Sequence, residues 1–278
     1  MADPDFVPPD LPFEPLPTTA EFMLDRDNWT FLNHGAFGAS LRCGYDRATQ
    51  WREYTETQPL RFFDRSLLPH LVHTGRQLAT FTNADRAGLA LLPNVTAGIN
   101  AAMNGYMRTN SSGRIVLWDT TYGSVKKIAR TVCPHVTEVP FQTKYLDRLD
   151  NDRDDAFVDA LLETLDTSCE TMNEWENALL ILDHTTSNTA LTMPIERLAQ
   201  IGKEHGMIVL VDGAHGLLAQ PVDFADLPSV DIYISNGHKW LSCPRGVAMM
   251  YCPNEELRET ILRRPAVFSH GLDDGYFR

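Results

Sequence analysis

Residues 208–216 read Ile208-Val209-Leu210-Val211-Asp212-Gly213-Ala214-His215-Gly216. Four apolar residues without polar alternation are typical of a strand that is covered on both faces. The run ends in a carboxylate and passes into a turn that contains two glycines. In open α/β sheets, ligands bind beyond the carboxyl ends of the strands. Asp212 is therefore predicted to lie at the ligand-binding edge of a sheet.

Similar short apolar runs lie on both sides of this stretch and predict further strands at 89–92, 115–118, 137–139, 179–182, 232–234 and 247–251. Helical periodicity predicts helices at 41–54, 67–81, 96–103, 122–132, 154–166, 194–205 and 255–264. Helices that alternate with strands covered on both faces indicate an α/β fold with a mostly parallel sheet.

The composition of the chain limits the kinds of molecule that it is expected to bind. Lys and Arg total 24 against 37 Asp and Glu, and the net charge of −13 opposes binding to nucleic acid or to an anionic membrane. The five cysteines form no C-x-x-C pair, so we expect reduced thiols and a cytoplasmic protein. We see no signal peptide, transit peptide or apolar run of membrane-spanning length. Small molecules are the expected partners.

Polar residues gather just past the predicted strands, in segments 94–98, 119–123, 183–188, 212–216 and 235–239. A desolvated Lys239 could attack an aldehyde as a neutral amine. Asp212 could hold a protonated pyridine nitrogen, and amide groups at the helix start after Asn94 favour a phosphate. Taken singly, each residue has a commoner explanation, namely a surface lysine, a salt bridge and a helix cap.

Four motifs occur together: Phe31-Leu32-Asn33-His34-Gly35, Asn94-Val95-Thr96-Ala97-Gly98, Val211-Asp212-Gly213-Ala214-His215 and Gly237-His238-Lys239-Trp240. In this order they resemble the class V aminotransferase family of fold-type I pyridoxal-phosphate enzymes, in the branch of isopenicillin N epimerase, cysteine desulfhydrases and sulfoxide lyases. The resemblance implies a three-layer α/β/α large domain, pyridoxal 5'-phosphate as cofactor, an amino-acid substrate and a homodimer.

The resemblance also implies roles for individual residues. Lys239 would form the Schiff base and Asp212 would pair with the pyridine nitrogen. The phosphate would be held by Thr96, the backbone of Ala97, Asn236 and His238. The ring face and phenolic oxygen would be contacted by Tyr122, His215 and Ser187, with Thr186 as an alternative to Ser187. The substrate would lie near Asn33, His34 and Arg61, the last reaching a site in this or a neighbouring subunit.

The domain boundaries follow from composition and from the same resemblance, since residues 1–20 are rich in proline and acidic residues. We expect an extended arm over 1–20, a helical segment packing on the large domain over 21–85 and the cofactor-binding large domain over 86–265. The family continues into a carboxyl-terminal small domain, so 266–278 would be the start of a truncated region.

The predicted reaction is β-elimination of a sulfur group from an amino acid. Epimerisation or transamination on the same cofactor, and a catalytically silent cofactor-binding paralogue, remain alternatives. Metal-dependent hydrolysis could use Asp183, His184, Asp212, His215 and His238 as ligands but leaves Lys239 without a role. A dinucleotide-binding fold is not indicated, because no G-x-G-x-x-G follows the first strand.

Overall fold

The computed structural model describes residues 7–16, 21–142, 150–168 and 172–262. Within these residues seven strands form one sheet in the order β1-β7-β6-β5-β4-β2-β3. The strands are β1 (Leu89–Leu92), β2 (Arg114–Trp118), β3 (His135–Val139), β4 (Leu179–Asp183), β5 (Ile208–Asp212), β6 (Ile232–Asn236) and β7 (Ala248–Tyr251). Strand β7 is antiparallel to both neighbours and the other pairs are parallel, which confirms the predicted mostly parallel sheet.

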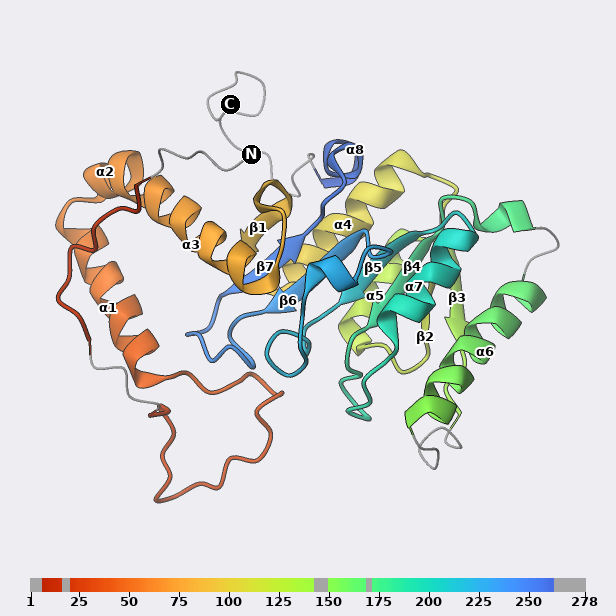
Figure 1. The fold of residues 1–278 in the computed structure, drawn as a ribbon, viewed down its shortest axis with the longest axis horizontal. Helices are drawn as coiled ribbons and strands as arrows, with labels where there is room; N and C mark the ends of the chain where they lie inside the picture. The colour runs from red at the N-terminus through yellow and green to blue at the C-terminus, as the bar shows by residue number, and fades with distance from the viewer. Residues whose placement is uncertain (1–6, 17–20, 143–149, 169–171, 263–278) are drawn as a thin grey trace.

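Helices cover both faces of the sheet in three layers (Figure 1). Helices α4 (Val95–Thr109) and α5 (Gly123–Val132) pack on one face, and α6 (Asp150–Ser168) and α7 (Ile195–Glu204) pack on the other. The predicted helix at 255–264 forms as α8 (Glu255–Leu257) and a π-helical turn (Arg258–Leu262) against α4, and its last two residues lie outside the described residues.

Side-chain alternation in the central strands determines which residues face each layer of helices. Leu182 and Val211 point into the core beneath α6 and α7, whereas Ile181, Leu210 and Ile234 point toward α4 and α5. All five side chains are completely buried, and each contributes roughly 1.5–3 kcal/mol to the free energy of unfolding. Because side chains alternate with a period of two, the terminal polar residues of β4, β5 and β6 must share the α4–α5 face.

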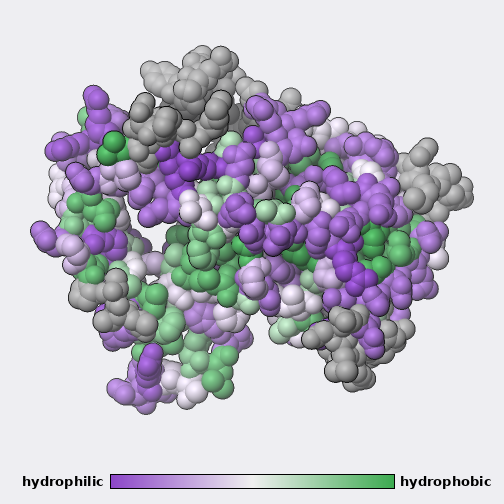
Figure 2. Space-filling model, viewed as in Figure 1, coloured by the Kyte–Doolittle hydropathy of each residue, from purple (hydrophilic) through white to green (hydrophobic). Residues whose placement is uncertain are grey.

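The amino-terminal part begins with a loop rather than a helix. Residues 21–41 carry only turns and an isolated bridge, and α1 (Arg42–Thr57), α2 (Pro59–Arg61), a π-helical turn (Phe62–Ser66) and α3 (Leu67–Thr82) follow. Helices α1 and α3 form a hairpin that projects away from the sheet (Figure 1). Figure 2 shows an opening between this hairpin and the rest of the molecule.

The residues before the hairpin lie along α1. The ring centroid of Phe13 lies 4.9 Å from that of Trp51, and the Arg47 guanidinium lies 5.0 Å above the Phe13 ring. Cation–π and edge-to-face contacts of this kind stabilise an arm that has no regular secondary structure of its own.

The loop before α1 is held against the segment after β6. The Leu41 N–H donates to the Ser242 carbonyl at 3.1 Å, and the Ser40 hydroxyl donates to the Cys243 carbonyl at 3.3 Å. Gly38 has a φ of +71°, and a Cβ there would lie 1.9 Å from the His238 carbonyl oxygen. Only glycine allows this approach, so Gly38 brings the loop to the sheet edge.

None of the helices in the described part of the chain combines the length and the apolar character needed to cross a membrane.

Candidate active site

A cavity of about 370 Å³ opens at the carboxyl edge of the parallel strands. Each of the five segments singled out from the sequence contributes to its wall, together with residues of the 33–37 loop. The polar side chains that line it are Asn33, Asn94, Thr96, Tyr122, Asp183, Thr185, Ser187, Asp212, His215, Asn236, His238 and Lys239. The strand-end rule thus correctly identified where the polar residues converge.

Asp212 ends β5 and is 5% exposed. Its Oδ1 accepts a hydrogen bond from the Ala214 N–H at 2.9 Å. Burial raises the pKa of Asp212, while the Ala214 hydrogen bond and the charge of Lys239 act in the opposite direction. A buried carboxylate facing a cavity is stabilised by a cation, so this wall fits a protonated ring nitrogen.

Asp183 is the register partner of Asp212 on β4 and is 2% exposed. Its Oδ2 accepts a hydrogen bond from the Thr121 hydroxyl at 2.6 Å, and its carboxylate also accepts from the Tyr122 N–H. Burial, followed by repulsion from Asp212, raises the pKa of Asp183 to about 7. Thr121 was not identified from the sequence, because its role depends on β2 and β4 being neighbours.

Lys239 follows β6 by three residues, lines the cavity, and has a partly buried side chain. Its Nζ lies 3.0 Å from Nε2 of His215. Burial lowers the pKa of Lys239, with a partial opposing effect from Asp212. Burial and the charge of Lys239 lower the pKa of His215 to about 4, so the imidazole is neutral at pH 7.

The start of α4 forms the end of the cavity that was predicted to hold a phosphate. Asn94 caps the helix, since its Oδ1 accepts from the Ala97 N–H at 2.8 Å, and Asn236 Oδ1 accepts from the Val95 N–H at 3.1 Å. The backbone of Ala97 and the side chain of Asn236 therefore already hold the helix start. Thr96 is exposed and lines the cavity.

His238 also lines the cavity, and its Nδ1 lies 2.9 Å from the Val247 carbonyl oxygen. Because a carbonyl only accepts hydrogen bonds, Nδ1 carries the proton and Nε2 is left as an acceptor in the neutral ring. Burial lowers the pKa of His238 and favours that neutral form.

Tyr122 and Ser187 line the cavity as expected, whereas Thr186 does not. The Thr186 hydroxyl lies 2.6 Å from the Thr189 hydroxyl and accepts from the Leu191 N–H at 2.9 Å. Of the two alternatives drawn from the sequence, only Ser187 faces the cavity.

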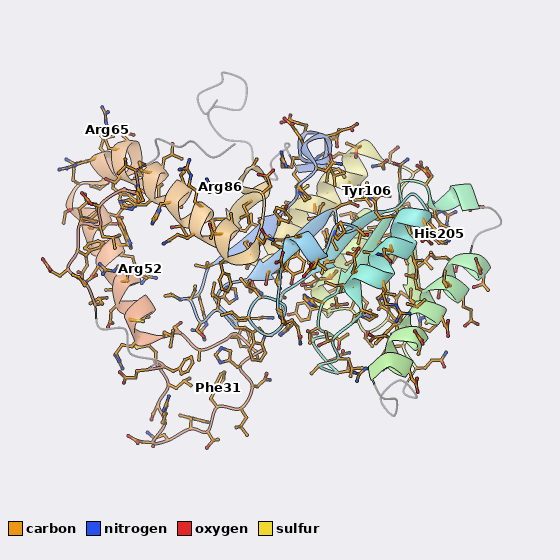
Figure 3. All side chains as sticks on the ribbon, viewed as in Figure 1. Phe31, Arg52, Arg65, Arg86, Tyr106 and His205 are labelled. Carbon is orange, nitrogen blue, oxygen red and sulfur yellow. The ribbon has the colours of Figure 1, made fainter. Side chains whose placement is uncertain are left out.

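The three predicted substrate residues have different positions. Asn33 lines the cavity. His34 lies behind it, with Nε2 2.8 Å from the Lys239 carbonyl oxygen and its ring 5.2 Å from the Trp240 ring. Arg61 is exposed in α2 and is not brought to this cavity. In Figure 3, Phe31 lies on the loop below the sheet, whereas Arg65, close to Arg61 in the chain, lies at the upper end of the hairpin.

The residues considered as metal ligands do not form one cluster. His184 is on the opposite sheet face from Asp183, and its Nδ1 lies 2.7 Å from the Tyr233 hydroxyl. In the described ranges, no group of three His, Cys, Asp or Glu side chains is arranged to hold a metal ion. Of the five residues considered, Asp183, Asp212, His215 and His238 line the cavity with Lys239, and His184 does not.

Trp240 and the segment 35–37 were given no individual role from the sequence, although Gly35 and Trp240 belong to two of its motifs. In the structure, residues 35–37 line the cavity and Trp240 lies behind His215. The indole N–H of Trp240 donates to Nδ1 of His215 at 3.4 Å. Asp183 follows Ile181 by two positions, and Asp212 follows Leu210 by two, so each carboxylate shares a strand face with an apolar residue. This pattern could have predicted that the two carboxylates lie together on one face of the sheet.

Known proteins resemble this chain over most of its length. It is 28% identical over 232 residues to the isopenicillin N epimerase of Streptomyces clavuligerus, covering 82% of this chain and 54% of that protein. It is 25% identical over 264 residues to the L-cysteine desulfhydrase of Arabidopsis thaliana, covering 92% and 57%. The chain therefore spans about half the length of the curated relatives it matches.

Solved structures share the fold. The cystine C-S lyase C-DES in complex with cysteine persulfide matches with a TM-score of 0.68 and 24% identity, covering 84% of this chain and 59% of that chain. A lysine variant of the same lyase holds glycine covalently linked to its pyridoxal-phosphate cofactor. A family model, aminotransferase class-V, matches residues 71–268. On this match the chain belongs to the aminotransferase class-V family, whose members the sequence motifs had indicated.

Proposed function

We propose that the chain binds pyridoxal 5'-phosphate and takes part in carbon–sulfur β-elimination from an amino acid. One observation carries the proposal: Lys239 and the buried Asp212 line the same cavity, at the ends of neighbouring strands β6 and β5. Family membership supports the cofactor, and a desulfhydrase among the relatives supports the reaction.

The residues of the cavity fit this cofactor. The volume of about 370 Å³ lies within the range of about 300–1,000 Å³ typical of small-molecule sites. The buried Asp212 suits a cationic ring nitrogen, and the Thr96 hydroxyl at the positive amino-terminal end of α4 suits a phosphate. Tyr122, half exposed at the cavity, provides an aromatic face.

When bound, the cofactor ring supplies an electron sink. Lys239, as a neutral amine, would hold the cofactor at its aldehyde and, once released, would accept the α-proton of the substrate. Asp212 would keep the ring nitrogen protonated, and Ser187 and His215, which line the same cavity, would bond the phenolic oxygen. Loss of the sulfur group with its electron pair, followed by hydrolysis, yields pyruvate, ammonia and a thiol.

The first test maps the reactive lysine. The protein is incubated with pyridoxal phosphate, reduced with borohydride and digested, and the labelled peptide is identified by mass spectrometry. We expect the label at Lys239, and its loss in Lys239→Ala but not in Lys203→Ala, which removes a surface lysine paired with Asp231. A label elsewhere, or none, contradicts cofactor binding by this residue.

The second test separates the reactions. The protein is incubated with cysteine and with cysteine-derived sulfoxides, and pyruvate is measured. Pyruvate from at least one of them is expected, and none from any would refute β-elimination. Exchange of the α-hydrogen for solvent deuterium without pyruvate would instead favour epimerisation, the activity named for one relative.

We also propose that the protein forms a homodimer. Apolar side chains exposed on α3 and β1, including Leu71, Val72 and Leu91, line a second hollow of about 540 Å³. Exposed apolar patches of this kind often mark protein interfaces. Light scattering during gel filtration should give twice the chain mass of 31.3 kDa, and a monomer mass would contradict the dimer.

A further inference from the structure

We infer that Trp240 is a positioning residue which fixes the proton of His215 on Nε2 and thereby holds Lys239 as a neutral amine. The inference deepens the proposed function, on which its catalytic consequence rests. The underlying geometry is a chain of three side chains, Trp240, His215 and Lys239, joined by contacts of 3.4 and 3.0 Å.

The direction of the first contact follows from chemistry alone. An indole N–H can only donate a hydrogen bond. Trp240 Nε1 faces His215 Nδ1, so Nδ1 must be the acceptor and cannot carry a proton. A neutral imidazole has one protonated nitrogen, and the proton therefore lies on Nε2.

The second contact follows from the first. Nε2–H points at Lys239 Nζ across 3.0 Å and needs an acceptor. A neutral amine has a lone pair that can accept this bond, whereas an ammonium group has only donors. The arrangement therefore favours the neutral form of Lys239, which is the form that attacks an aldehyde or removes a proton.

Neighbouring residues keep the indole and the imidazole in place. The His34 ring lies against the Trp240 ring at 5.2 Å, and its Nε2 bonds the Lys239 carbonyl. A Cβ at Gly35 would lie 3.0 Å from Cε1 of His215 and 3.4 Å from Cζ2 of Trp240. The loop backbone thus packs directly on both rings, which limits reorientation of His215.

Other charged groups also act on Lys239. Burial favours the amine form of Lys239, and Asp212 favours its ammonium form. Asp183, His238 and Tyr122 are the other titratable side chains that line the cavity with His215. Trp240 therefore shifts an existing equilibrium between the amine and ammonium forms of Lys239. Comparing variants measures this shift separately from the other effects.

The first experiment follows the pH dependence of Lys239 acetylation. The full chain without cofactor is treated with trace acetic anhydride at different pH values, and acetylation at Lys239 is quantified by mass spectrometry. Trp240→Phe keeps an aromatic ring but removes the N–H, so His215 can present a bare Nε2 to an ammonium. The midpoint should rise by about one pH unit, the size expected when the charged form gains one hydrogen bond.

Trp175→Phe is the matched control, because it removes an indole hydrogen bond to the Leu165 carbonyl at 3.1 Å, far from the cavity. Its Lys239 midpoint should equal that of the wild type. An unchanged midpoint in folded Trp240→Phe, or an equal rise in the control, would overturn the inference.

The second experiment uses wild-type protein, so it does not depend on whether a variant of Trp240 folds. In wild-type protein labelled with ¹⁵N-histidine, NMR should show His215 protonated on Nε2 and bare on Nδ1 at pH 7 to 8, with His215→Gln identifying the signal. Protonation on Nδ1 would refute the inference. Both experiments use protein without cofactor. They therefore test the inference about His215 and Lys239 even if Lys239 does not bind the cofactor.

Discussion

Asp183 and Asp212 are register partners at the carboxyl ends of β4 and β5, and both carboxylates are buried in the wall of the same cavity. Burial and, after it, repulsion from Asp212 raise the pKa of Asp183 to about 7, so the doubly ionised state of the pair is disfavoured. A cation bound between them would relieve the repulsion. Cation binding at the cavity, protonation of these two carboxylates and the stability of the folded protein should therefore depend on one another.

Replacing Asp212 by Asn should weaken cofactor function. An amide cannot stabilise a protonated ring nitrogen, and a nearby carboxylate raises the pKa of such a group by about 1–3 units, so activity should fall roughly 10- to 1,000-fold. Pyruvate formation and cofactor affinity by absorbance titration are the measurements. Asp155→Asn, which alters a surface carboxylate bonded to Arg197, should change neither. Full activity in Asp212→Asn would contradict the assigned role.

Asp183 should make the protein less stable as pH rises. Its folded pKa of about 7 lies above the ordinary value of 3.8, so the native state binds more protons between these pH values. Stability is then lost as pH increases from about 4 to 7, by at most roughly 1.4 kcal/mol per pH unit. Urea unfolding of cofactor-free Asp183→Asn should show a smaller loss, because Asp212, whose pKa burial also raises, remains in the variant. Identical pH profiles for the two proteins would refute the prediction.

His184 should have the opposite effect. Burial lowers its pKa to about 4 from 6.5, so the unfolded chain binds more protons between these values. The contribution is fully present above pH 6.5 and is lost as pH falls toward 4. His184→Gln should therefore unfold with a weaker dependence on pH over this range in urea titrations. His215 acts in the same direction and remains in the variant, so the dependence should shrink without vanishing.

Gly38→Ala should destabilise the protein by more than about 2 kcal/mol, because a left-handed φ and a 1.9 Å contact with His238 both oppose a Cβ. Gly75→Ala is the contrasting change. It lies inside α3 with open space around its Cβ position, so it should stabilise the protein by about 0.5–1 kcal/mol. Equal effects of both substitutions on the urea midpoint would show that the loop contact is unimportant.

Much of the architecture could be read from the sequence because the relevant patterns are local. The apolar runs at 179–182, 208–211 and 232–234 are strands, and the polar segments after them meet at one edge. This works because strands buried on both faces need continuous apolar residues, and because parallel strands bring their carboxyl ends together. Lys239 and Asp212 were identified in this way.

Other features depend on contacts between distant segments. The 33–41 loop reaches the cavity only by packing on 238–243, about 200 positions later in the chain, so the placement of His34 behind Trp240 could not be read from either segment alone. Likewise the position of Arg61 away from this cavity follows from the direction of the helical hairpin.

The sequence by itself determined which strand ends carry the polar side chains of the cavity, since alternation and apolar runs are properties of neighbouring residues. Only the tertiary structure decided how those groups are held. The proton position on His215, the Thr121 bond to Asp183 and the choice of Ser187 over Thr186 each depend on which donor meets which acceptor across the fold. Hydrogen bonds are directional and short, so they are specified by three-dimensional packing and not by spacing along the chain.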